Sequence, residues 1–175
     1  SLRDALPICV LLSRIWMSRF GGPDEALAYP RLALFAPLGM TSAVMEADAA
    51  GTFVGSSYVY ATARDWARFG LFLADDGVWK GERLLPEGFV AQMQMPTAAS
   101  GSQYTQLQAW QVGPGGEADE TFGLSPETYW LLGHDGQSVA ILPSERLVVV
   151  RLGLTPSKLG YRPQALVKAV SDALK

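Results

Sequence analysis

The sequence predicts an α+β fold, an antiparallel sheet flanked by helices, and three observations support this. Apolar side chains recur at intervals of three and four over residues 4–20, which is the spacing of an amphipathic helix. Two β-branched runs, 137–142 and 146–152, are joined by the short turn 143–145, as in a β-hairpin. Helical spacing returns at 162–174. Because helices and strands are segregated along the chain instead of alternating, the sheet is expected to be antiparallel.

The first half of the chain is predicted to be mostly helical. After the helix at 4–20, a short helix begins at Asp24 as its N-cap and ends near Tyr29, just before a proline. Residues 62–65 have a capping-box pattern, in which Thr accepts a backbone hydrogen bond and Asp reaches back to the N-cap. A proline at a first helical position predicts a further helix over 87–94.

The second half is predicted to hold the strands. Residues 106–112 alternate polar and apolar side chains, which indicates a half-buried strand, and 128–132 form another apolar strand candidate. Residues 41–57 lack periodicity and are expected to form a long ordered loop. A Gly- and acid-rich segment, 113–120, is expected to be a solvated loop and not a metal site, because no His accompanies its carboxylates.

Composition limits the possible partners. The net charge of −3 gives no electrostatic reason to expect nucleic acid or an anionic membrane surface. Charged residues make up 18% of the 175 residues and hydrophobic ones 49%. This composition fits either a core-rich domain or a fragment whose apolar faces pack against a missing half of the domain. The single cysteine, Cys9, excludes an internal disulfide, and one Cys with one His disfavours a structural zinc site.

The start of the chain carries no readable targeting signal. The first residue is Ser1 and not Met, so we expect the natural start to lie upstream. Residues 5–12 are apolar but lack the basic start and cleavage site of a signal peptide, and we interpret them as helix. No apolar run reaches the roughly 18 residues of a membrane span.

Several phrases together resemble one superfamily. They are FAPLGM at 35–40, SYVYATARDWARFG at 57–70, DGVWKGERLLP at 76–86, GHDGQ at 133–137 and VVVRLG at 148–153. In this order and spacing they resemble class C-like serine β-lactamases and penicillin-binding proteins, most closely the family VIII-type esterases and the nylon-oligomer hydrolases. The resemblance extends over nearly the whole chain from about Val10.

The resemblance implies three active-site motifs, of which this chain carries one. No Ser is followed three residues later by Lys, so S-x-x-K, which holds the nucleophile, is absent. The chain contains no Asn, so a Tyr-x-Asn motif is absent too. His134-Asp135-Gly136 takes the place of the third motif, K-T-G. Since the first two motifs precede this region in the superfamily, residues 1–175 are expected to be the C-terminal portion of one hydrolase domain that lacks its N-terminal half.

The resemblance also implies a role for each residue of the third motif. The Gln137 N–H is expected to supply half of an oxyanion hole, and Gly136, lacking Cβ, to let substrate approach the strand edge. His134 is expected to face the pocket and hydrogen-bond the substrate. Because His carries a weaker fixed charge than Lys near neutral pH, ester or amide hydrolysis is favoured over β-lactam hydrolysis. The implied partner is a small-molecule ester, amide or β-lactam, with no cofactor, and export to the periplasm is suggested by the superfamily alone.

Other interpretations of the same residues remain. A lone His beside a Gly is often structural, and residues 136–140 approach the G-x-S-x-G elbow of α/β-hydrolases, although the residues after Ser138 are strand-like. Trp110 and Trp130 either line a substrate cleft or pack in the core. The alternative for the chain as a whole is a truncated, non-catalytic product without activity of its own.

Overall fold

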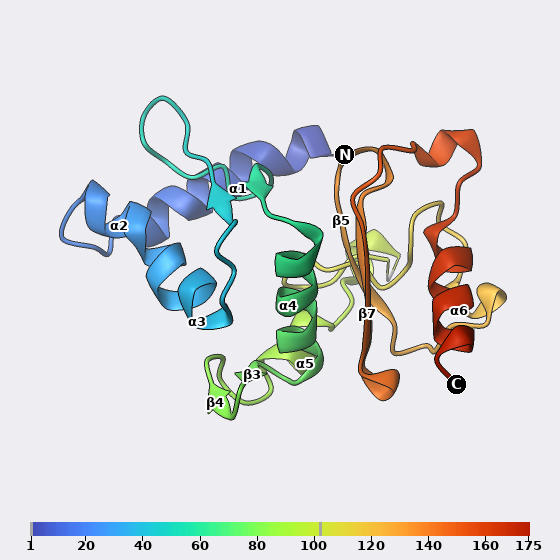
Figure 1. The fold of residues 1–175 in the computed structure, drawn as a ribbon. Coiled ribbons are helices and arrows are strands. Elements are labelled where there is room, and N and C mark those ends of the chain that lie inside the picture. The colour runs from blue at the N-terminus through green and yellow to red at the C-terminus, as the bar shows by residue number, and fades with distance from the viewer. Residues whose placement is uncertain (1, 102) are drawn as a thin grey trace. The chain divides into compact units, whose positions relative to one another are not determined.

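The computed structural model describes residues 2–101 and 103–175, so Ser1 lies outside the described residues. The helices are α1 Leu2–Met17, α2 Pro23–Pro30, α3 Ala36–Leu38, α4 Ala63–Ala74, α5 Phe89–Met93 and α6 Pro163–Ala173. The strands are β1 Val44–Met45, β2 Val59–Tyr60, β3 Val78–Trp79, β4 Glu82–Arg83, β5 Tyr129–Leu132, β6 Ser138–Leu142 and β7 Leu147–Arg151 (Figure 1). The chain divides into two compact units, Ser1–Asp65 and Trp66–Lys175, and each is described by itself. The α+β class predicted from the sequence is confirmed.

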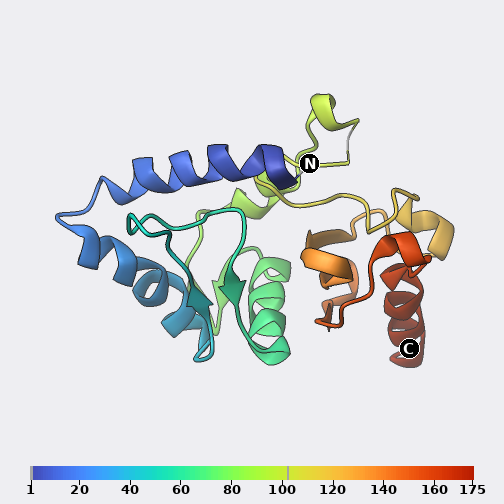
Figure 2. The same cartoon turned by 90° about the horizontal axis from the view of Figure 1, so that it is seen from above.

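The first unit is built on α1 and α2. Figure 2 shows the two helices joined by a tight turn, after which α2 runs back. Met17 and Ala26 are buried with Phe53, whose ring stacks on that of Trp16 at a centroid distance of 6.0 Å. The residue at the N-cap of α2 is Gly22 and not Asp24, because Pro23 already occupies the first helical position.

The PLGM turn consists of the short helix α3 and its cap. Gly39 ends the helix with φ +70°, a left-handed conformation that glycine adopts without strain. Leu38 and Met40 on either side of it are each 1% exposed. Both therefore anchor the turn in the core.

The predicted capping box at residues 62–65 is only half formed. The Asp65 N–H donates to Thr62 Oγ1 at 3.4 Å, but the Asp65 carboxylate does not return to Thr62. It accepts instead from the N–H and hydroxyl of Ser42, at 2.9 and 2.5 Å. The short Asp65 side chain therefore binds the loop that contains Ser42 instead of its own helix N-terminus. The segment after Ser42 also contains the antiparallel pair β1–β2, where the sequence predicted no strand.

The second unit holds a three-stranded antiparallel sheet of order β5-β6-β7. In the register of β6 and β7, Val139 pairs with Val150 and Ala140 with Val149. All five residues of β6 are buried. Successive side chains of a strand point to opposite faces, so a fully buried central strand needs cover on both faces of the sheet.

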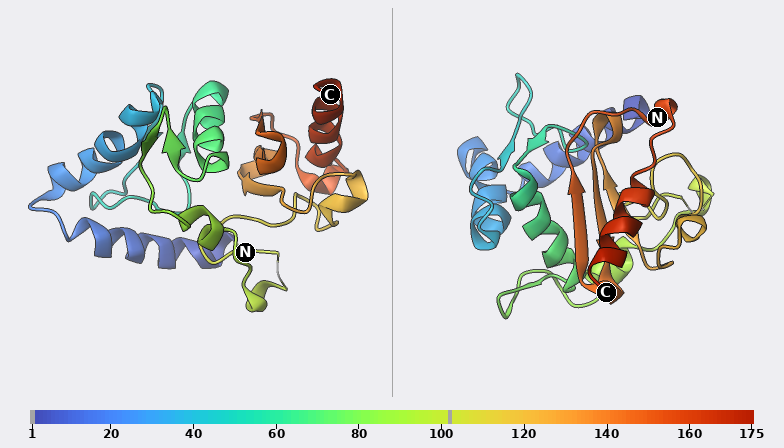
Figure 3. Two further views of the ribbon diagram at one scale, coloured as in Figure 1. Left: turned by 90° about the horizontal axis from the view of Figure 1, so that it is seen from below. Right: turned by 45° about the vertical axis from the view of Figure 1, so that its right-hand side comes forward.

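Helices α4 and α6 provide that cover from opposite sides (Figures 1 and 3). On one face, Val167 of α6 is buried against Trp130, Ala140 and Leu142. On the other face, Gly70 of α4 lies directly against Val139 and Val148. The sheet is thus the middle layer of the second unit.

Two predicted elements differ from those in the structure. Residues 106–112 do not form a strand, because Gln108 has φ +68° and Thr105 closes a turn with Ala109. Only Trp110 pairs with the sheet, through two backbone hydrogen bonds to Trp130 of 3.0 and 2.8 Å. The helix predicted over 87–94 is α5, which begins at Phe89, three residues after Pro86. Within residues 2–101 and 103–175, every helix is too short or too polar to span a bilayer.

Replacing Gly70 with Ala is expected to lower the free energy of unfolding by about 1–3 kcal/mol. In an open helix position the same change would stabilise the protein by about 1 kcal/mol. Here the added Cβ would lie 2.5 Å from Cγ1 of Val148, so α4 must move away from the sheet. Chemical denaturation measures the effect, and a Gly70→Ala, Val148→Ala double variant should show favourable coupling because it removes the clashing methyl groups. A stabilised Gly70→Ala single variant would contradict this packing.

Candidate active site

The loop between β5 and β6 carries the residues predicted to form the third motif. The Gly133 N–H donates to the Gln137 carbonyl at 2.8 Å, and this bond closes the loop. Between them, His134 to Gly136 form one 3₁₀ turn in which Asp135 has φ +50° and Gly136 φ +83°. A non-glycine residue in the left-handed region costs free energy and persists where surrounding contacts hold it.

Those contacts come from the segment after β7. The Thr155 N–H donates to the Asp135 carbonyl at 2.7 Å. A Cβ on Gly136 would lie 2.2 Å from the Thr155 carbonyl oxygen. Glycine is therefore required because the chain's own backbone approaches it closely. That the missing Cβ also gives room to a substrate stays a prediction.

The His134 side chain points into solvent, whereas Gln137 forms hydrogen bonds inside the loop. The side chain of His134 is 78% exposed, and its Nε2 lies 3.1 Å from Asp135 Oδ2. The backbone N–H of Gln137 donates to the His134 carbonyl at 3.3 Å, and its side-chain amide donates to the same oxygen at 3.1 Å. The amide predicted to bind an oxyanion thus makes one long hydrogen bond inside its own turn.

An open cavity of about 300 Å³ lies against the loop. Its wall includes Gly136 and Gln137 from the loop, Pro114 from the 113–120 segment, and Pro156 and Lys158 from the chain after β7. His134 does not contribute to the wall. The structure therefore brings two of the three predicted site residues, Gly136 and Gln137, to one cavity and leaves the His134 imidazole outside it.

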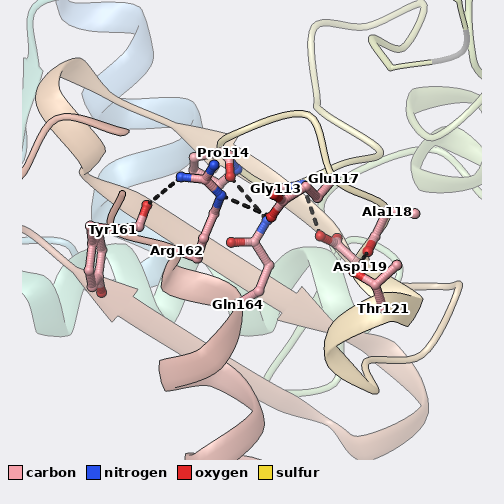
Figure 4. A network of polar contacts seen from close by, with 9 residues as sticks. All are labelled: Gly113, Pro114, Glu117, Ala118, Asp119, Thr121, Tyr161, Arg162 and Gln164. Atoms are coloured by element: carbon pink, nitrogen blue, oxygen red, sulfur yellow. Dashed lines mark hydrogen bonds and ion pairs between the residues drawn. The ribbon is translucent and has the colours of Figure 1, made fainter. Parts of the chain in front are cut away.

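A buried polar network supports the Pro114 side of this cavity (Figure 4). Gln164 on α6, fully buried, donates to the Pro114 carbonyl at 3.1 Å. Asp119, 4% exposed, accepts from the Gly113 N–H at 3.0 Å and from the Trp130 indole N–H at 2.5 Å. Burial raises the pKa of Asp119, and the hydrogen bonds from Trp130, Gly113 and Gln164 act in the opposite direction.

Sequence reasoning missed this network. Asp119 was predicted to belong to a solvated loop, and that is wrong for Asp119 although it holds for Glu120, which is exposed. A signal was present in Trp130, since a tryptophan in a buried strand needs an acceptor for its indole N–H. Trp130 is 0% exposed and Ser138 is buried within β6, so the core interpretation of the first and the strand interpretation of the second are confirmed. Among the side chains that the structure describes, no three His, Cys, Asp or Glu residues gather as metal ligands.

Comparison with known proteins agrees with the resemblance seen in the sequence. The profile of the Beta-lactamase family matches residues 21–166, which is most of the chain. A crystal structure from Bacteroides dorei DSM 17855, assigned as a beta-lactamase, is similar at 19% sequence identity and a TM-score of 0.49, over 82% of this chain. The chain spans about half the length of that protein, 49%. No curated protein matches the sequence. From the family match over residues 21–166, we conclude that this chain belongs to the Beta-lactamase family.

Proposed function

We propose that this chain forms the C-terminal part of a serine hydrolase domain that cleaves small-molecule esters or amides through an acyl-enzyme. The family acts on small molecules. In the proposal, the 133–137 loop forms one wall of the substrate pocket. The serine nucleophile and its lysine partner belong to polypeptide outside these 175 residues, because no S-x-x-K occurs within them.

The Gln137 peptide group at the cavity wall carries the proposal. Attack on an ester builds negative charge on the carbonyl oxygen, and a backbone N–H held in a rigid turn stabilises that charge without reorganising. The N–H of Gln137 makes only a 3.3 Å bond to the His134 carbonyl. A hydrogen bond to an anionic oxygen is shorter and about twice as strong as one to a neutral carbonyl. If the Gln137 N–H leaves the His134 carbonyl and binds the oxyanion, the transition state is therefore stabilised.

The residues in the place of the third motif favour ester or amide substrates over β-lactams. K-T-G is replaced by His134-Asp135-Gly136, and the His134 imidazole is shared with Asp135 at 3.1 Å. An imidazole paired with a neighbouring carboxylate presents less positive charge to a substrate carboxylate than a free ammonium does. A substrate without a carboxylate loses little by this change.

In the proposal, a substrate bound in the open cavity extends past its wall to the His134 imidazole and accepts a hydrogen bond from it. The His134→Ala variant of the whole gene product should therefore lower kcat/KM for a p-nitrophenyl ester by about tenfold, close to 1.4 kcal/mol of transition-state binding. The fold should be unchanged, because this side chain is 78% exposed. Thermal melting and steady-state kinetics measure the two effects, with Glu127→Ala, an exposed acid before β5, as the control. Unchanged kinetics in His134→Ala would remove His134 from the site.

Two further assays address the absent nucleophile. The upstream coding sequence is read for an in-frame S-x-x-K, and the 175-residue chain alone is incubated with a p-nitrophenyl ester and a chromogenic cephalosporin. The proposal predicts the motif upstream and no turnover by the isolated chain. Turnover by the isolated chain would contradict the assignment of the nucleophile, and an upstream sequence without the motif would favour a non-catalytic product.

A further inference from the structure

The side chain of Arg151, the last residue of β7, connects the candidate site to the segment after that strand. In the sheet register Arg151 pairs with Ser138, the first residue after the 133–137 loop. Its guanidinium donates to the Gly136 carbonyl at 3.2 Å, to Thr155 Oγ1 at 2.6 Å and to the Gly153 carbonyl. The same group lies over the ring of Tyr161, 4.3 Å from its centroid.

The Gly136 carbonyl belongs to the peptide group that carries the Gln137 N–H. A peptide group is planar and trans, so its C=O and N–H point in opposite directions. Whatever fixes the direction of the Gly136 carbonyl therefore also fixes the direction of the Gln137 N–H. At its other end the peptide group is held only by the 3.3 Å bond from Gln137 to the His134 carbonyl. The guanidinium is thus the stronger of the two constraints, since a charged donor binds more tightly than a neutral one.

Arginine is suited to this place by its shape. The guanidinium binds three acceptors through two of its nitrogens and also lies over an aromatic ring. A planar group with several N–H donors can make these contacts together, whereas an ammonium offers a single point charge. The turn also needs such support, because Asp135 has φ +50° and Gly136 φ +83°. A loosened turn would relax towards conformations in which the peptide group rotates.

We propose that Arg151 is a positioning residue, which aims the Gln137 N–H by holding the Gly136 carbonyl. The proposal rests on the proposed function only in treating that N–H as the oxyanion donor. The orientation of the peptide group by Arg151 is a structural claim and is tested without any assay of activity.

Hydrogen exchange of the ¹⁵N-labelled whole gene product provides the first test. In Arg151→Met, the Gln137 amide should exchange about tenfold faster than in the wild type, while the amides of Val139 and Ile141 in β6 stay within about twofold. Arg151→Lys should shift Gln137 in the same direction by a smaller factor. Arg146→Met is the control, because Arg146 is an exposed arginine of the same hairpin that contacts Asp75 and not the loop.

Each outcome of the exchange experiment decides the structural claim. Wild-type exchange at Gln137 in both Arg151 variants overturns it. If Arg151→Met loosens the whole sheet, so that Val139 and Ile141 also exchange faster, Arg151→Lys decides, because it keeps the charge and the side-chain stem. Faster exchange at Gln137 alone in Arg151→Lys supports the claim, and unchanged exchange there overturns it.

Kinetics of the whole gene product provide the second test. Arg151→Met should lower kcat for an ester by about tenfold or more with KM nearly unchanged, because an oxyanion donor acts in the transition state. The preference for the ester over the matching thionoester, whose sulfur accepts hydrogen bonds poorly, should shrink in this variant and not in Arg146→Met. If the protein hydrolyses the ester and Arg151→Met leaves kcat unchanged, the positioning role of Arg151 is overturned. A protein without hydrolase activity overturns the proposed function and leaves the exchange result standing.

Discussion

Replacing Asp119 with Ala is expected to lower the free energy of unfolding by about 3–6 kcal/mol. The carboxylate of this buried residue accepts from the Trp130 indole at 2.5 Å and from the Gly113 N–H at 3.0 Å. Alanine leaves these donors buried without an acceptor, and each such group costs roughly 1–3 kcal/mol. The Gln164 side chain loses the same partner. Urea unfolding followed by tryptophan fluorescence measures the loss.

A neighbouring acid provides the matched control for Asp119. Glu120 is exposed, so Glu120→Ala removes the same charge from the same turn and leaves no buried hydrogen-bond donor without an acceptor. It should change the free energy of unfolding by less than about 0.5 kcal/mol. Equal destabilisation by the two variants would show that net charge matters here and that the buried network does not.

The stability of the wild type relative to Asp119→Asn should depend on pH. Burial raises the pKa of Asp119 in the folded protein, so the folded state holds this proton more tightly than the unfolded chain does. Its contribution to stability is therefore fully present below the unfolded pKa of about 3.9 and is lost as the pH rises through the folded pKa. The unfolding free energy of the wild type minus that of Asp119→Asn should fall as the pH rises from about 4. A difference that grows with pH would mean that the pKa is lowered instead.

Gly136→Ala is expected to lower the free energy of unfolding by about 2–4 kcal/mol and to disrupt the 133–137 loop. Its φ of +83° strains any residue with a Cβ, and that Cβ would lie 2.2 Å from the backbone oxygen of Thr155. Backbone cannot turn aside as a flexible side chain does. The loop must therefore move, at the cost of the 2.7 Å bond from the Thr155 N–H to the Asp135 carbonyl. Unfolding measurements and the amide shift of Thr155 report both effects.

Gly81→Ala separates backbone strain from the close approach. Gly81 has φ +86°, almost the same as Gly136, and nothing lies within 4 Å of the position of its Cβ. This variant should therefore show only the conformational cost of about 1 kcal/mol. If Gly136→Ala were no more destabilising than Gly81→Ala, the contact between Gly136 and Thr155 would not be as close as the structure has it.

Where the sequence carries a strong local pattern, the fold agrees with it. Strand β6 and its hairpin partner were predicted to within one residue, because β-branched runs around a short turn leave few alternatives. The half-formed capping box of Asp65 shows the limit of this reasoning. Its carboxylate binds Ser42, which is 23 positions earlier in the chain, and local pattern does not predict such a partner.

The contacts that hold the 133–137 loop could not be predicted from the sequence. The GHDGQ phrase pointed to this loop through its resemblance to a known motif, the structure places a cavity beside the loop, and its catalytic role stays a prediction. The reason for Gly136 and the burial of Asp119 depend on contacts with Thr155 and Trp130, which only the folded chain reveals. The strand predicted from alternating polar and apolar side chains over 106–112 was wrong, because Gln108 adopts φ +68° and interrupts the extended backbone.

Covalent labelling tests the central claim most directly. The whole gene product is treated with a fluorophosphonate, which bonds to activated serines, and the labelled peptide is identified by mass spectrometry. We expect a single modified serine in an S-x-x-K motif outside residues 1–175, with labelling weakened by Arg151→Met. A label on a serine of this chain, such as Ser138, or a protein that resists labelling while it hydrolyses esters, would contradict it.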